Sequence, residues 1–135
     1  MRAPAALLLL LLAGCPQGYA GTYATLDVEA KAAQVAREAL PEVSRAAQDA
    51  CRSGHRGDEA AVRACLGGVR AAVRRLAGAL SAVLDKTRAA VTMVSAAERA
   101  GAPVRSVYFW AGEAMAAYLA AQQVAADLGY KMGGL

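Results

Sequence analysis

Apolar residues recur at alternating steps of four and three through the middle of the chain. Ten valines and leucines lie between residues 62 and 94, and eight of them fall on ten regularly spaced positions. These positions, here called the seam, are Val62, Leu66, Val69, Val73, Leu76, Leu80, Val83, Thr87, Ala90 and Val94. The spacing places them on one stripe of an α-helix that packs as in a coiled coil. We therefore expect one helix from Asp58 to Ala100, with Asp58 as its N-cap and Gly101 just beyond its end.

A second helix is predicted before the seam, from Tyr23 to Cys51. It carries two rows of apolar residues with a spacing of seven: Leu26, Ala33, Leu40 and Ala47, with a companion row of Ala36, Val43 and Ala50. Pro41 interrupts this pattern, because proline lacks a backbone donor and disfavours the helical conformation at Leu40. We expect a kink or a break at Pro41.

A third helix is predicted from Pro103 to Leu128. Only Glu113 is charged between residues 107 and 121, and aromatic or aliphatic side chains occur on several faces. A helix that is apolar on nearly all sides is expected in a core or in a self-association interface. Contact with a membrane is the alternative, whereas a true membrane span is disfavoured by the length of the stretch and by the carboxylate within it.

The three predicted helices are joined by short connections. The fold class that follows is all-α: an antiparallel helical hairpin or three-helix bundle with coiled-coil-like packing over residues 23–129. Residues 130–135 are expected to be a flexible tail.

The first fourteen residues have the pattern of an export signal. Arg2 supplies a positive charge, and an unbroken leucine run from Leu7 to Leu12 follows it. This run is too short to cross a bilayer, whose hydrocarbon core is about 30 Å thick. Residues 1–14 are therefore expected to be a cleaved signal peptide.

The signal ends in Leu12-Ala13-Gly14-Cys15. This tetrapeptide resembles the lipobox of the bacterial lipoprotein class, which reads Leu, then Ala or Ser, then Gly or Ala, then Cys. The resemblance implies a diacylglycerol on the Cys15 sulfur, cleavage before Cys15 and often an acyl chain on the new N-terminus. Residues 15–22 would then be a lipidated tether. The alternative is an ordinary secretion signal with a chance cysteine.

Location follows from the same resemblance. Class members kept at the inner membrane often carry Asp after the modified cysteine, whereas this chain has Pro16. The resemblance thus favours the outer membrane, with the protein facing the periplasm. A host with a single membrane would place it on the outer face of the cytoplasmic membrane.

Two cysteines remain after Cys15. Export places Cys51 and Cys65 in an oxidising compartment, where thiols pair. We expect a disulfide between them near the turn that joins the first two helices. A metal site is disfavoured, because His55 is the only further ligand type nearby, and no metal or other cofactor is expected apart from the covalent lipid.

Arginines dominate the start of the central helix. Arg63, Arg70, Arg74 and Arg75 follow one another with no intervening acid. They are candidates for docking an anionic partner protein or cell-wall carboxylates, and the alternative is a solvated helix face. Nucleic acid is disfavoured by the compartment and by the lack of interleaved aromatic residues.

Catalytic patterns are not recognised in the sequence, and the function expected is non-catalytic. We predict a lipid-anchored envelope protein that acts as an interaction or structural module, with an envelope protein or a second copy as its partner. The alternative is a carrier of small hydrophobic ligands, with a groove beside Tyr108, Trp110 and Tyr118. Glu113 is expected to pair with an arginine or to lie exposed at the rim of the bundle.

Overall fold

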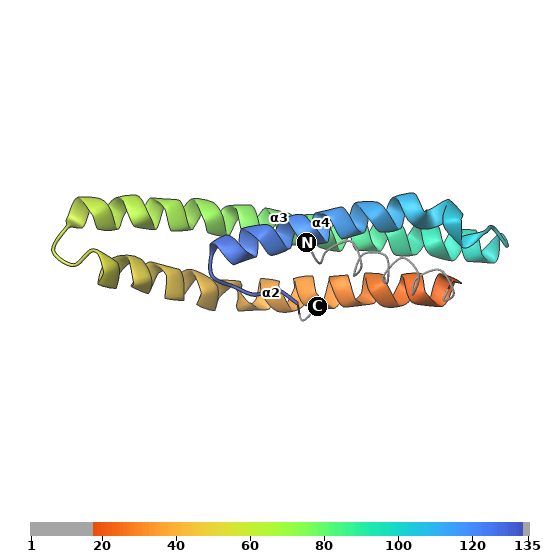
Figure 1. Cartoon of the computed structure of the whole chain (residues 1–135), viewed down its shortest axis with the longest axis horizontal. Coiled ribbons are helices and arrows are strands. Elements are labelled where there is room, and N and C mark those ends of the chain that lie inside the picture. The colour runs from red at the N-terminus through yellow and green to blue at the C-terminus, as the bar shows by residue number, and fades with distance from the viewer. Residues whose placement is uncertain (1–17, 134–135) are drawn as a thin grey trace, which may run out of the picture.

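The protein is an antiparallel three-helix bundle, which confirms the expected fold class. The computed structural model describes residues 18–133. Within them lie α2 (Gly18–Gly54), α3 (Glu59–Arg99), the 3-10 helix η1 (Val104–Val107) and α4 (Tyr108–Asp127). Figure 1 shows α2 and α3 side by side along the whole molecule, with α4 against only one half of this pair.

Both ends of α3 lie where the sequence predicts them. Asp58 caps the first turn, and its carboxylate accepts a hydrogen bond from the backbone N–H of Ala61 at 3.1 Å. At the other end Gly101 has a φ of 68°, which is the left-handed conformation that glycine adopts without strain. The N–H groups of Gly101 and Ala102 donate to the carbonyls of Glu98 and Ala97, at 3.1 and 2.9 Å. These bonds form a Schellman motif, which reverses the chain toward α4.

Burial along the seam divides the molecule into two halves. The later seam residues are buried: Leu76, Leu80, Val83, Thr87, Ala90 and Val94. The earlier ones, Val62, Leu66, Val69 and Val73, are only half-buried. We call residues 41–75 the arm; within it only Cys51 and Ala72 are buried. The arm is a two-helix hairpin, and the rest of the described chain forms a three-helix base.

A kink or a break was expected at Pro41, and the break does not occur. The helix α2 continues through Pro41 from Gly18 to Gly54. The side chain of Pro41 is exposed, and so is Arg37, whose carbonyl loses its helical donor. Water can satisfy a carbonyl on the exposed side of a helix, so the helix does not need to end there.

The predicted tether and tail are also shorter than expected. Residues 18–22, assigned above to the tether, belong to α2, because Tyr19 and Tyr23 pack against the buried cluster around Leu26. At the other terminus the chain turns at Gly129 and crosses α2 (Figure 1). Met132 is there only 3% exposed, and its carbonyl accepts a hydrogen bond from the Gln122 side chain at 3.2 Å. The chain through Met132 thus belongs to the base.

Candidate functional site

The disulfide turn joins α2 and α3 at the tip of the arm. The sulfur atoms of Cys51 and Cys65 are bonded at 2.06 Å, with their Cα atoms 5.7 Å apart. Cys51 is buried, whereas His55 and its neighbours in the turn are exposed. The bond holds the tip of the arm together where few apolar contacts are available.

The four candidate arginines all lie exposed on the arm, but they do not form one patch. Successive helical residues are rotated by roughly 100°, so Arg75 faces a different side of α3 from Arg74. Arg63 lies 4.0 Å from the carboxylate of Glu59. The ion pairs found among residues 18–133 include none with Arg70, Arg74 or Arg75.

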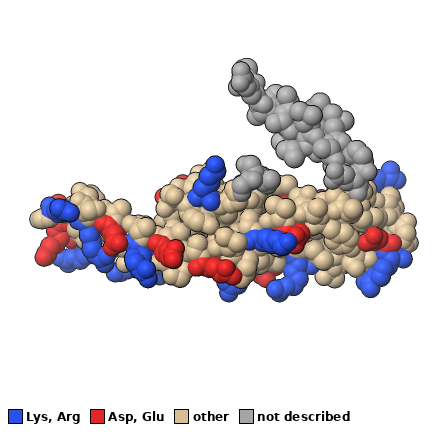
Figure 2. Space-filling view, turned by 90° about the horizontal axis from the view of Figure 1, so that it is seen from below, with Lys and Arg blue, Asp and Glu red and all other residues tan. Residues whose placement is uncertain are grey.

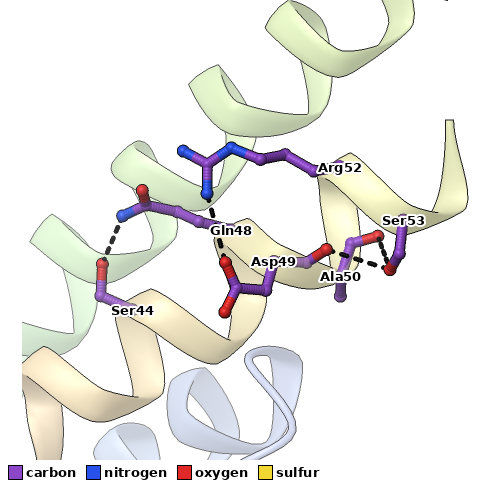
Figure 3. Close-up of polar contacts among 6 residues, drawn as sticks. All are labelled: Ser44, Gln48, Asp49, Ala50, Arg52 and Ser53. Atoms are coloured by element: carbon purple, nitrogen blue, oxygen red, sulfur yellow. Dashed lines mark hydrogen bonds and ion pairs between the residues drawn. The ribbon is translucent and has the colours of Figure 1, made fainter. Parts of the chain in front are cut away.

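Acidic and basic side chains are mixed at the end of the molecule that carries the arm. In Figure 2 blue and red side chains alternate over the end of the molecule that carries the disulfide turn. Arg52 pairs with Asp49 at 3.2 Å within the last turns of α2. Figure 3 shows that pair beside a hydrogen bond from the Gln48 side chain to the Ser44 hydroxyl. In the same view the Ser53 hydroxyl donates to the carbonyls of Asp49 and Ala50. The polar groups of α2 near the tip are thus partly satisfied within α2 itself.

The aromatic residues of α4 do not line a common groove. Tyr118 is 1% exposed and belongs to the core, whereas Tyr108 is 46% exposed and Trp110 is half-buried. The groove predicted beside these three residues is therefore wrong in its assignment of Tyr118. Glu113 lies at the rim of the bundle, where its carboxylate accepts a hydrogen bond from Lys86 of α3 at 3.3 Å.

A layer of polar residues crosses the base. One apolar cluster contains Leu26, Ala90, Val94, Val107 and Ala114, and the other contains Ala33, Ala36, Leu76, Leu80, Val83, Tyr118, Ala121, Ala125 and Met132. Between the clusters α2 contributes Glu29 and α3 contributes Thr87, both buried. The Thr87 hydroxyl donates to the carbonyl of Val83 at 2.8 Å. The Glu29 carboxyl oxygens and the Tyr118 hydroxyl have no hydrogen-bond partner in the described structure.

Burial controls the ionisation of this layer. Glu29 is 1% exposed, and the loss of water raises the pKa of its carboxyl from 4.5 to about 7. Burial also raises the pKa of Tyr118, and the nearby Glu29 adds to that shift. The Glu29 carboxyl can therefore take up and release a proton near neutral pH, in the middle of the base.

Sequence reasoning missed Glu29, although a signal for it was present. The companion row of Ala36, Val43 and Ala50 extends backward by seven residues to Glu29. A charged residue on an otherwise apolar row indicates a buried acid.

Several predicted features lie outside the described residues or remain predictions. Cys15 and the signal segment 1–14 are not among residues 18–133. No helix within the described range is long and apolar enough to cross a membrane. The same part of the chain contains no group of three His, Cys, Asp or Glu side chains placed to hold a metal ion.

Comparisons with known proteins identify no relative. No protein-family model, curated protein or solved structure matches the chain.

Proposed function

We propose that this protein is a lipid-anchored protein of the bacterial envelope, and that its arm is a non-catalytic docking module. The Cys15 lipid would hold the start of α2 at the outer membrane, facing the periplasm. The disulfide tip lies at the opposite end of α2 from that start, so it would extend away from the bilayer (Figure 1).

The observation that carries this proposal is the incomplete burial of the arm. In the base, α4 completes a three-helix core, and the seam residues from Leu76 to Val94 are buried. In the arm, the seam residues from Val62 to Val73 are half-buried, because none of residues 18–133 forms a third helix beside them. A helix from a partner that continues the position of α4 would complete this burial.

Charge indicates the chemistry of that partner. The stretch from Arg63 to Arg75 contains four arginines and no acid, and Arg70, Arg74 and Arg75 are exposed without an ion pair in the described structure. An amphipathic segment with acidic residues would complement the side of α3 that carries Arg70 and Arg74, and it would be guided to that side electrostatically. The partner is either an envelope protein or a second copy of this chain, whose own arm carries the acids Glu42 and Asp49 on α2.

The anchor is tested by the intact mass of protein purified from bacterial envelopes. We expect a chain that begins at Cys15 and carries a diacylglycerol, and a Cys15→Ser variant that lacks the lipid. An unmodified Cys15 thiol, or a retained leader, would refute the anchor.

The docking role is tested by photo-crosslinking in the envelope from a reactive residue placed at Val69. Combined Arg70→Glu and Arg74→Glu substitutions should abolish the crosslink. A matched pair in the base, Arg37→Glu with Arg88→Glu, should leave it intact, because both side chains are exposed and lie outside the arm. Equal crosslinking in both double variants would contradict docking through the arm, and a small hydrophobic molecule retained in native mass spectrometry would favour the carrier alternative.

A further inference from the structure

Most aromatic residues of the chain gather at one end of the bundle. The sequence contains five tyrosines, one tryptophan and one phenylalanine. Of these seven, Tyr19, Tyr23, Tyr108, Phe109 and Trp110 lie where the start of α2 meets the turn between α3 and α4 (Figure 1). We call this region the aromatic end.

Hydrogen bonds fix the start of α2 against the turn. The Tyr19 hydroxyl donates to the carbonyl of Ala102, and the Tyr23 hydroxyl donates to the carboxylate of Glu98 at 3.1 Å. Their rings pack against the buried cluster that contains Leu26 and Val107. The position at which the chain enters the bundle is thus held directly beside the beginning of α4.

Two of these rings face outward. Phe109 is 66% exposed and Tyr108 is 46% exposed, which are large values for aromatic side chains. Phe109 makes an edge-to-face contact with Trp110, with ring centroids 5.4 Å apart. Between Arg105 and Glu113 the chain has no charged residue, whereas Arg99 and Arg105 lie exposed on the turn. The exposed rings thus lie in an uncharged stretch of the chain, and the charged residues that precede it are Glu98, Arg99 and Arg105.

The predicted anchor attaches next to this surface. Gly18 is the first described residue of α2 and follows Cys15 by three residues. Three residues span at most about 11 Å even when they are fully extended. A lipid on Cys15 would therefore hold the aromatic end within the depth of the headgroup region.

We propose that the aromatic end rests in the bilayer interface, with Phe109 and Tyr108 inserted beside the lipid anchor. This inference rests on the proposed lipidation of Cys15. The amphipathic ring of Tyr108 suits the boundary between headgroups and acyl chains, and the apolar ring of Phe109 is stabilised by burial among the acyl chains. The protein would then be held by two attachments, the lipid on Cys15 and the inserted rings of the aromatic end. Two attachments also fix the direction in which the arm extends from the membrane.

Trp110 is the only tryptophan of the chain and reports on this contact directly. The mature chain, residues 15–135, has one free thiol when Cys51 and Cys65 are bonded. Coupling Cys15 to maleimide lipid in phosphatidylcholine vesicles supplies an anchor whether or not a cell attaches one. Trp110 fluorescence is then compared between plain vesicles and vesicles whose lipids carry bromine in the upper acyl chain, since bromine quenches only nearby indoles.

We expect bromine to lower Trp110 emission in the coupled protein, and a Tyr108→Ser with Phe109→Ser variant to lose this quenching. Both side chains are exposed, so the variant should keep its helical circular dichroism. The control is Val35→Ser, which removes a 58% exposed apolar side chain from α2, and its quenching should be unchanged. Coupled protein without quenching, or equal quenching in all three proteins, would overturn the membrane contact. Because the anchor is supplied chemically, this result is independent of whether Cys15 is lipidated in cells.

Discussion

At the scale of single residues, the buried Glu29 carboxyl lowers the stability of the folded state when it is ionised. An ionised carboxylate without a partner is strongly disfavoured in a dry interior, so the protonated form is preferred. The pKa of Glu29 is therefore about 7 in the folded chain, against 4.5 as the reference value. Below pH 4.5 the group is protonated in both states and costs little. As the pH rises from about 4.5 to 7, the unfolded chain gains the charge more readily, and the folded state loses stability.

Glu29→Gln should remove this pH dependence. The amide has nearly the same shape and no charge, so the variant should be more stable than the parent above pH 7, by up to roughly 3 kcal/mol for a shift of this size. The advantage should shrink toward zero near pH 4.5. Urea unfolding at several pH values measures it. Glu42→Gln, at an exposed site on the same helix, is the control and should show no comparable trend. Parallel curves for the parent and Glu29→Gln would contradict the account.

The seven-residue rows of α2 contain enough information to place Glu29 in the core, because it falls on the row of Ala36 and Val43. The sequence does not predict that the Tyr118 hydroxyl lacks a hydrogen-bond partner in the described structure. This feature depends on the returning tail, in which Gly133 lies so close that a Cβ atom there would overlap the Tyr118 hydroxyl oxygen. Local sequence patterns do not report such long-range approaches.

At the scale of helices, prediction succeeded where local chemistry determines the structure. The Asp58 cap and the Gly101 turn involve bonds between residues at most five positions apart, so the limits of α3 follow from neighbouring residues. The break that was expected as one of two outcomes at Pro41 does not occur, because local preference conflicts there with packing. The half-buried Leu40 packs against the larger apolar cluster, and the Cys51–Cys65 bond holds the far end of α2 against α3. These contacts keep the helix continuous, although the Arg37 carbonyl lacks the hydrogen bond that a backbone N–H at residue 41 would donate.

Pro41→Ala should therefore stabilise the protein. Proline in the interior of a helix costs about 3 kcal/mol relative to alanine, and the exposure of this site to water reduces that figure. We expect a gain of roughly 1–3 kcal/mol in the free energy of unfolding, measured by urea titration. Pro41→Gly restores the same backbone donor without the helix preference of alanine, and it should gain about 1 kcal/mol less. An unchanged or lower stability of Pro41→Ala would show that α2 is already strained or bent to suit proline.

At the scale of the whole molecule, the core is unevenly distributed. The base has buried core residues on all three helices and a docked tail, whereas the arm has half-buried seam residues and one disulfide. Hydrophobic stabilisation follows the apolar area removed from water, so the arm contributes less per residue. The disulfide therefore holds together a hairpin whose four seam residues are only half-buried, and this half-buried surface is the one proposed above for docking.

This unevenness should appear in native-state hydrogen exchange. Amides of α3 between residues 62 and 75 should show lower opening free energies, and so faster exchange, than amides between residues 76 and 94. Replacing both Cys51 and Cys65 with serine should lower the free energy of unfolding by roughly 3 kcal/mol, the chain-entropy value for a loop of about fifteen residues. The added exchange should be concentrated in the arm, because the base keeps its three-helix core without the bond. If the loss of protection were uniform over α3, arm and base would unfold as one unit, and the arm would lack the independent adaptability that docking a partner helix requires.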